Sequence, residues 1–334
     1  MGGLLTELGK KLAERWLTLL AVPGALYLAA VTAAISLDHA HPFALTRLTH
    51  RVDELGRGAQ AHGPAGLAVL LIAALLASAA IGLAAQAAGS LIERQWLGTD
   101  WLGWPDLLRR YARSRVQRRR RRWNNANIEY QREDAAYQRE RERAAARRAL
   151  AHSAARSDMP VQPGEERAVA RRRLLRISVD LPTTPTWMGD RLESVVHRIH
   201  RDLNVELAIV WPSLWLTAPD TIRGEITVAR EALTRATTMA GWGTLYLLVG
   251  LVWWPGLLIA AITLITAWRR GRASTEEYAL LVEATVRLQA PELARILGLI
   301  EQTQEFTQET GGRLTCALDG SDDRASTTQP RSDS

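Results

Sequence analysis

The feature that most constrains the fold is an apolar run from Ala65 to Ile92 that contains no charged side chain. A helix crosses the hydrocarbon core of a bilayer with about 20 apolar residues, so this run is long enough to span one with a tilt. A dense set of arginines follows it, and basic residues beside a span retain that flank in the cytoplasm. The set is Arg109, Arg110, Arg113, Arg115, Arg118, Arg119, Arg120, Arg121 and Arg122. The junction predicts a membrane helix with its C-terminal end in the cytoplasm.

Three further apolar stretches, at about 16–37, 236–253 and 255–268, complete a predicted four-span topology. The first contains a Pro-Gly pair, which membrane helices tolerate. Most of the 12 tryptophans lie at or near the ends of these stretches, as in an aromatic belt. The last stretch is short, so it either crosses fully by snorkelling its flanking arginines or forms half of a re-entrant hairpin.

The distribution of charge sets the expected orientation. The net charge is +7, and basic residues flank all four stretches on the sides that lie together if both termini are cytoplasmic. We therefore expect an all-α, four-span, multi-pass protein of the bacterial cytoplasmic membrane. Its parts are a hairpin at 1–95 with spans 16–37 and 65–92 and an outward loop 38–64, a long basic helix at 96–158, a cytoplasmic module at 159–235, a second hairpin at 236–270, a cytoplasmic helix at 271–310 and a disordered tail at 311–334.

The region between the hairpins begins with a stretch from Pro105 to about Ala155 that has no internal Pro or Gly. It predicts one long charged helix. Apolar residues recur on it every seven positions, but a coiled coil needs two per heptad. Either this stripe packs on a partner helix, or the helix is mainly solvated. The stripe consists of Val116, Trp123, Tyr130, Tyr137 and Ala144.

The following segments are shorter. Prolines and a glycine at 153–166 predict a linker, and alternating apolar residues at 175–181 predict an extended segment. A helix is expected at about 189–203, and another begins at the N-cap residue Asp220. A capping-box pattern at 274–277 predicts the start of a helix that runs to about Phe306, with a possible break near Pro291.

The arginine set has three possible roles. Arginines neutralise nucleic-acid phosphates, attract anionic lipid head groups or fix membrane topology. Because the set lies close to the end of the second span, we predict topology and contact with anionic lipids, and not nucleic-acid binding.

Two groups of residues could hold a metal. His39 and His41 lie in the outward loop, and Glu193, His197 and His200 share one face of the predicted helix. We interpret the first group as ordinary loop histidines and the second as a surface or salt-bridged helix face. The single Cys316 rules out a disulfide within one chain, and the chain contains no nucleotide-binding loop or paired-cysteine zinc motif. We predict no cofactor, no metal and no catalytic residue.

The second span carries small residues at four-residue spacing, which lets another helix approach closely. That helix could belong to the same chain or to another subunit. Gln86 and Ser90 are the strongly polar residues of this span, and they could line a pore or hydrogen-bond a neighbouring helix. The small residues are Ala74, Ser78, Gly82, Ala85 and Gly89.

Two segments that contain proline and tryptophan, Leu181 to Leu192 and Val210 to Leu216, carry a resemblance. Together with the following hairpin, they resemble a family of uncharacterised multi-pass membrane proteins from actinobacteria and related bacteria. The likeness covers roughly residues 175–300. It implies a membrane topology and transfers no catalytic residue.

These observations predict a non-enzymatic protein that acts as an oligomeric scaffold, sensor or pore. The small-residue face and the seven-residue stripe would mediate association of a homo-oligomer. A more specific alternative is an ion channel or a component of a transport system. A membrane-bound metalloenzyme would use the face of Glu193, His197 and His200.

Overall fold

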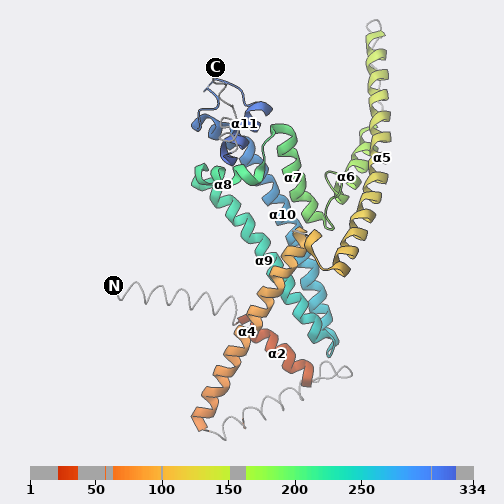
Figure 1. Ribbon diagram of the computed structural model, residues 1–334. Helices are drawn as coiled ribbons and strands as arrows, with labels where there is room; N and C mark the ends of the chain where they lie inside the picture. The colour runs from red at the N-terminus through yellow and green to blue at the C-terminus, as the bar shows by residue number, and fades with distance from the viewer. Residues whose placement is uncertain are drawn as a thin grey trace. The chain divides into compact units, whose positions relative to one another are not determined.

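Every regular element in the described part of the chain is a helix (Figure 1). The computed structural model describes residues 22–36, 57, 63–98, 101–150, 163–301 and 303–320. The all-α prediction is confirmed. The elements are α2 (Val22–Ser36), α4 (Gly63–Leu97), the 3₁₀ turn η2 (Trp101–Gly103), α5 (Asp106–Leu150), α6 (Pro163–Ile177), α7 (Trp187–Leu203), α8 (Leu207–Thr217), α9 (Asp220–Gly250), α10 (Trp254–Ile296) and α11 (Gln308–Asp319).

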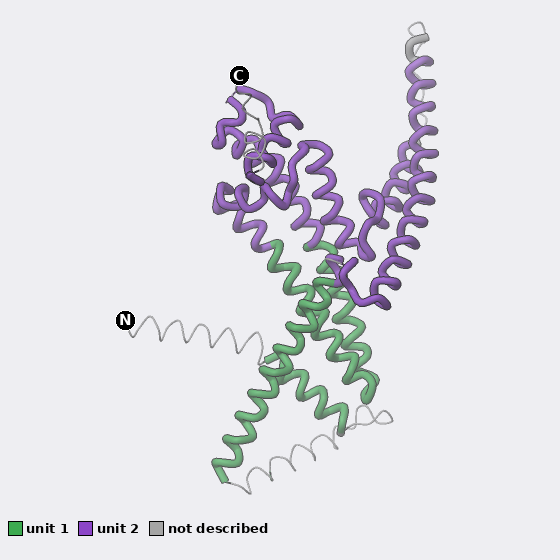
Figure 2. The backbone as a smooth tube through the Cα atoms, viewed as in Figure 1, with its two compact units in different colours: residues 1–94, 229–274 green, residues 95–228, 275–334 purple. Residues whose placement is uncertain are grey.

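The chain divides into two compact units, and each unit is built from two separate stretches of sequence (Figure 2). Unit 1 comprises residues 1–94 and 229–274. Unit 2 comprises residues 95–228 and 275–334. Helices α9 and α10 therefore each contribute to both units.

Unit 1 has small residues where its helices meet and large apolar residues on its outside. Ser78, Gly82, Ala85 and Gly89 are the buried residues of α4. Tyr27 on α2 packs edge-on against Tyr246 of α9, with ring centroids 5.3 Å apart, and donates its hydroxyl to the carbonyl of Leu245 at 3.2 Å. Large apolar side chains are exposed on α4, α9 and α10, among them Leu71, Leu75, Leu76, Leu248, Leu258, Ile262 and Ile265.

Within the described ranges, α4 is the one helix that is both long and apolar enough to cross a membrane. Shorter apolar helices occur at Val22–Ile35 and Leu207–Thr217. The first predicted span begins at residue 16, and residues 16–21 lie outside the described part of the chain. Helix α4 contains the predicted span 65–92 and extends beyond both of its ends.

Helix α5 is long, as predicted, and it packs on α6 of the same chain, with Tyr137 of the predicted stripe at the contact. Val116 is buried, and the other four stripe residues are half-buried. The guanidinium of Arg167 on α6 lies 4.6 Å from the ring centroid of Tyr137, a cation–π contact. Arg167 also pairs with Asp134 at 3.3 Å and Arg173 with Glu129 at 2.6 Å, so α5 and α6 run antiparallel. The part of the stripe around Tyr137 therefore has its partner within the chain.

Helix α6 shows that two predictions are partly wrong. It begins inside the predicted linker 153–166 and ends inside the predicted extended segment 175–181. Pro163 is the first residue of the helix, a position where its missing N–H has no helical partner in any case. Glu165 and Glu166 in the first turn favourably face the positive end of the helix dipole. The helix continues to Ile177, so residues 175–177 are helical and only residues 178–186 are irregular. Residues 153–162 lie outside the described residues.

The predicted helix start at Ser274 is wrong, because α10 runs without interruption from Trp254 to Ile296. Ser274 donates its hydroxyl to the carbonyl of Arg270 at 2.9 Å, a bond that serine makes inside helices. Glu276 instead accepts the Nε of the buried Arg191 on α7 at 2.8 Å. Pro291 does not break the helix, since buried packing around it at Ala290 and Ala294 offsets the lost backbone bond.

The core of unit 2 lies among α7, α8, α10 and α11. Ile199, Leu214, Val286 and Leu314 are fully buried there, one from each helix. Because Leu314 belongs to α11, the predicted disordered tail is wrong for residues 311–319, which are helical. Thr307 caps the start of this helix. Residues 321–334 lie outside the described part of the chain.

Candidate functional site

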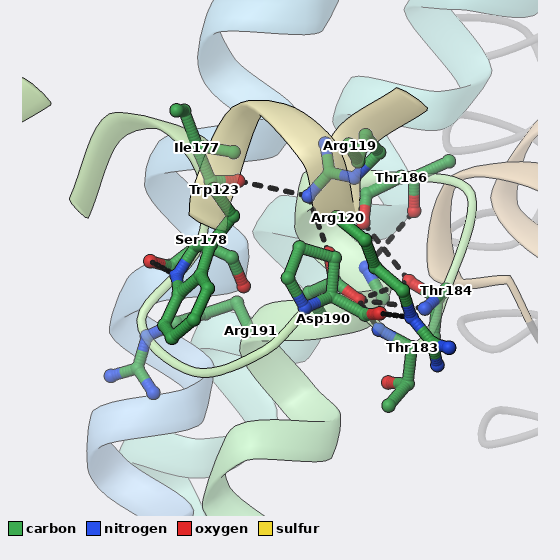
Figure 3. Close-up of polar contacts among 12 residues, drawn as sticks. Arg119, Arg120, Trp123, Ile177, Ser178, Thr183, Thr184, Thr186, Asp190 and Arg191 are labelled. Atoms are coloured by element: carbon green, nitrogen blue, oxygen red, sulfur yellow. Dashed lines mark hydrogen bonds and ion pairs between the residues drawn. The ribbon is translucent and has the colours of Figure 1, made fainter. Parts of the chain in front are cut away.

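The most connected polar site in unit 2 is the carboxylate of Asp190 in the first turn of α7 (Figure 3). Its side chain is only 2% exposed. One carboxylate oxygen accepts the backbone N–H of Thr183 at 2.9 Å and that of Thr184 at 2.7 Å, and also the hydroxyl of Thr184 at 3.1 Å. The other oxygen pairs with Arg119 of α5. A buried charge is tolerated when it is paired and hydrogen-bonded, and this one is both.

Three neighbouring side chains of α5 hold the irregular segment between α6 and α7 (Figure 3). Arg119 donates to the carbonyl of Ile177 at 2.9 Å, and Arg120 donates to that of Pro182 at 2.7 Å. The indole N–H of Trp123 donates to the carbonyl of Ser178 at 3.2 Å. These contacts satisfy carbonyls that a helix or sheet would otherwise have satisfied. Arg119 and Arg120 therefore stabilise this part of the fold, and their predicted role in topology and lipid contact stays a prediction.

The remaining arginines of the set either contact residues of α5 itself or are exposed. Arg109 pairs with Asp106 of the same helix. Arg115 lies against Tyr111, with its guanidinium carbon 5.9 Å from the ring centroid. The members whose side chains are exposed are Arg110, Arg113, Arg115, Arg118, Arg121 and Arg122. All six lie in the N-terminal half of α5.

The first turns of α5 add apolar residues to this basic surface. Leu107 is 81% exposed, and Leu108 and Tyr111 are also exposed. At helical spacing, Leu107, Tyr111, Arg115 and Arg118 follow one another along one face. We call this face, which is apolar at its start and basic further along, the α5 outer face.

The predicted metal candidates on α7 form pairs and not a ligand set. His197 lies 3.5 Å from Glu193, and His200 lies 3.7 Å from Glu206, with both imidazoles more than half exposed. Within the described ranges, no three His, Cys, Asp or Glu side chains converge as metal ligands would. His39 and His41 lie outside the described residues.

The predicted small-residue face of α4 has partners in unit 1. A Cβ built on Gly24 of α2 would lie 2.9 Å from the Cα of Ser78, and one built on Gly89 would lie 2.9 Å from the Cα of Thr238 on α9. Such distances require backbones in direct contact. Ala74 is exposed, so its close packing against another helix stays a prediction.

A carboxylate also ties α4 to α9 at the end of this face. Glu93 is 16% exposed and pairs with Arg230. It also accepts the hydroxyl of Thr237 at 3.3 Å. The two polar residues on which the pore alternative rests, Gln86 and Ser90, are exposed.

The charged end of α7 makes stability depend on pH. Asp202 accepts hydrogen bonds from Arg287 at 2.7 Å and Arg201 at 3.2 Å, and these bonds lower the pKa of its carboxyl. A carboxyl whose pKa is depressed by folding stabilises the folded state above its unfolded pKa, and this contribution is lost as the pH falls through the folded pKa.

We therefore expect Asp202→Asn to lower thermal stability at pH 7, and we expect this difference to shrink as the pH falls below the ordinary carboxyl pKa and the wild-type carboxyl becomes protonated. Because the pair is partly exposed, the loss at pH 7 should stay below about 1 kcal/mol. Melting curves of wild type and variant across this pH range measure it. Asp319→Asn, at an exposed position, is the control. A difference that stays constant with pH would contradict this account.

Comparison with known proteins adds no assignment: no family model, no curated protein and no solved structure matches the chain.

Proposed function

We propose that this chain is a four-span, non-enzymatic protein of the bacterial cytoplasmic membrane, with both termini in the cytoplasm, and that it serves as an oligomeric scaffold. The proposal rests on how residues are distributed in unit 1, which buries small residues between its helices and exposes large apolar residues. This distribution is the opposite of that in a soluble protein. Soluble proteins rarely expose large contiguous apolar patches, whereas bilayer-embedded helices do so and pack through small residues.

The four spans would be α2, α4, the second half of α9 and the first half of α10. In α4 the exposed leucines include Leu70, Leu71, Leu75, Leu76 and Leu83. In α10, Leu257, Leu258, Ile262 and Ile265 are exposed before the first arginine, Arg269. Main-chain groups in a bilayer must be paired internally, and an all-helical unit meets that requirement.

The partner that suits the α5 outer face is an anionic membrane surface. Exposed leucine and tyrosine insert into the head-group region, and arginines next to them contact lipid phosphates. Since the chain passes from α4 into α5 within a few residues, this face starts close to the end of the span in sequence.

The homo-oligomer part of the proposal rests on Gln86. Its amide is exposed on α4 among alanine and glycine residues, and an amide facing lipid without a partner is unfavourable. A second copy of the chain that hydrogen-bonds Gln86 would remove this penalty. The same residue supports the second candidate function, a channel in which Gln86 and Ser90 of several copies line the pore.

Cysteine labelling tests the topology, because Cys316 is the single native thiol. In a Cys316→Ser background we expect His50→Cys in intact cells to react with a membrane-impermeant maleimide. Gln138→Cys on α5 should react only after permeabilisation, and Leu75→Cys should resist the reagent in both cases. Reaction of positions 50 and 138 from the same side would refute the four-span topology.

Reconstituted liposomes separate the two functions. A scaffold should retain a trapped dye, and Gln86→Leu should lower its oligomeric mass. A channel should release the dye, and Gln86→Leu should slow that release.

A further inference from the structure

Unit 2 contains an apolar cavity that the proposed function does not use. Its volume is about 340 Å³, within the range of about 300–1,000 Å³ typical of small-molecule sites. Three helices form its walls. Helix α7 contributes leucine and valine side chains, α8 contributes Ala208, Trp211 and Pro212, and α10 contributes Tyr278.

A carboxylate and a main-chain carbonyl are hydrogen-bond acceptors at this cavity, and the Trp211 indole and the Tyr278 hydroxyl are groups that can donate. Glu206 is the only charged side chain among its lining residues, in a chain that holds 42 Lys and Arg residues. Its carboxylate is about half exposed, and His200 lies 3.7 Å away. Pro212 inside α8 has no N–H, so the carbonyl of Ala208, one turn earlier on the cavity wall, lacks its usual helical donor.

Aromatic rings complete the site. Trp211 and Tyr278 both line the cavity, from different helices. Trp215 packs against Trp211, with ring centroids 6.0 Å apart, and limits the positions that the Trp211 ring can take. An aromatic wall beside a carboxylate attracts organic cations, because the ring face carries negative charge density.

We propose that this cavity binds a hydrophobic organic cation, with the apolar body among the valines and leucines and the ammonium group beside Glu206 and Trp211. An organic anion would face the Glu206 carboxylate with no arginine or lysine in the cavity wall to compensate. A neutral apolar molecule would fill the cavity, but its affinity would not depend on the charge of Glu206. The proposal does not depend on the membrane topology.

Benzyltrimethylammonium is a suitable probe because it is water-soluble, carries one ring and one fixed charge, and does not form micelles. We expect isothermal titration of the detergent-solubilised full chain to show one site for it and none for phenylacetate. Glu206→Gln should weaken binding about fivefold, the scale of a partly exposed charge contact. The matched control, Glu225→Gln, removes an exposed carboxylate on α9 and should leave binding unchanged.

Ala208→Trp is the blocking variant, since Ala208 is exposed at the rim and its replacement does not overpack the core. We expect this variant to retain the wild-type circular dichroism and melting temperature and to lose binding. The proposal is overturned if phenylacetate binds as well as the cation, if Glu206→Gln binds like wild type, or if folded Ala208→Trp still binds.

Discussion

Gly241→Leu is expected to destabilise unit 1 by about 3 kcal/mol or more, because it forces α9 away from α4. Even a Cβ at Gly241 would overlap the carbonyl oxygen of Ala85 and lie 2.9 Å from the backbone nitrogen of Gly89. Backbone atoms within a helix cannot move aside as a flexible side chain does. Fluorescence-detected size exclusion and thermal melting of the solubilised chain measure the effect.

Gly224→Ala is the matched control in the same helix. Nothing lies within 4 Å of a Cβ built on Gly224, so alanine should be tolerated there. Alanine also favours a helix by about 1 kcal/mol over glycine, so the variant should be as stable as wild type or more stable. If Gly241→Leu melts like Gly224→Ala, α4 and α9 do not pack through these glycines.

Asp190→Ala should destabilise unit 2 by about 3–5 kcal/mol, the usual effect of removing one partner from a buried ion pair. The substitution leaves the guanidinium of Arg119, whose side chain is 17% exposed, without its carboxylate. It also removes the acceptor of the backbone N–H groups of Thr183 and Thr184. Chemical denaturation followed by circular dichroism measures the loss.

Two variants separate charge from hydrogen bonding at this site. Asp190→Asn keeps one oxygen acceptor and removes the charge, so its loss should be smaller than that of alanine. Glu129→Ala removes the partner of Arg173 in an exposed ion pair and should change stability by less than about 1 kcal/mol. Equal losses for Asp190→Ala and Glu129→Ala would show that the Asp190 site does not hold α5 to α7.

Local periodicity was sufficient to predict the helices whose apolar residues repeat regularly. The uncharged run of α4 and the proline-free stretch of α5 are examples, and both are helices over nearly the expected bounds. The burial of Ser78, Gly82, Ala85 and Gly89 was also predictable, because small residues at four-residue spacing have few other uses.

The secondary-structure predictions that were wrong concern residues whose conformation is decided by contacts with residues far away in the sequence. Residues 274–277 have the pattern of a helix start, but Glu276 is the ion-pair partner of Arg191, far away in sequence. Leu314 lies in a polar segment, and only its burial against α7 and α8 shows why α11 is ordered. The Asp190 site could not be predicted for the same reason, since Arg119 and Asp190 are neighbours only in space.

The interleaved composition of the two units has a consequence for biosynthesis. Residues 1–94 leave the ribosome long before residues 229–274, which complete unit 1. Until Gly241 has been translated, the close-packing face of α4 around Ala85 and Gly89 has no α9 to meet. Likewise, unit 2 awaits residues 275–334. A nascent chain that stops before residue 229 therefore contains neither unit complete.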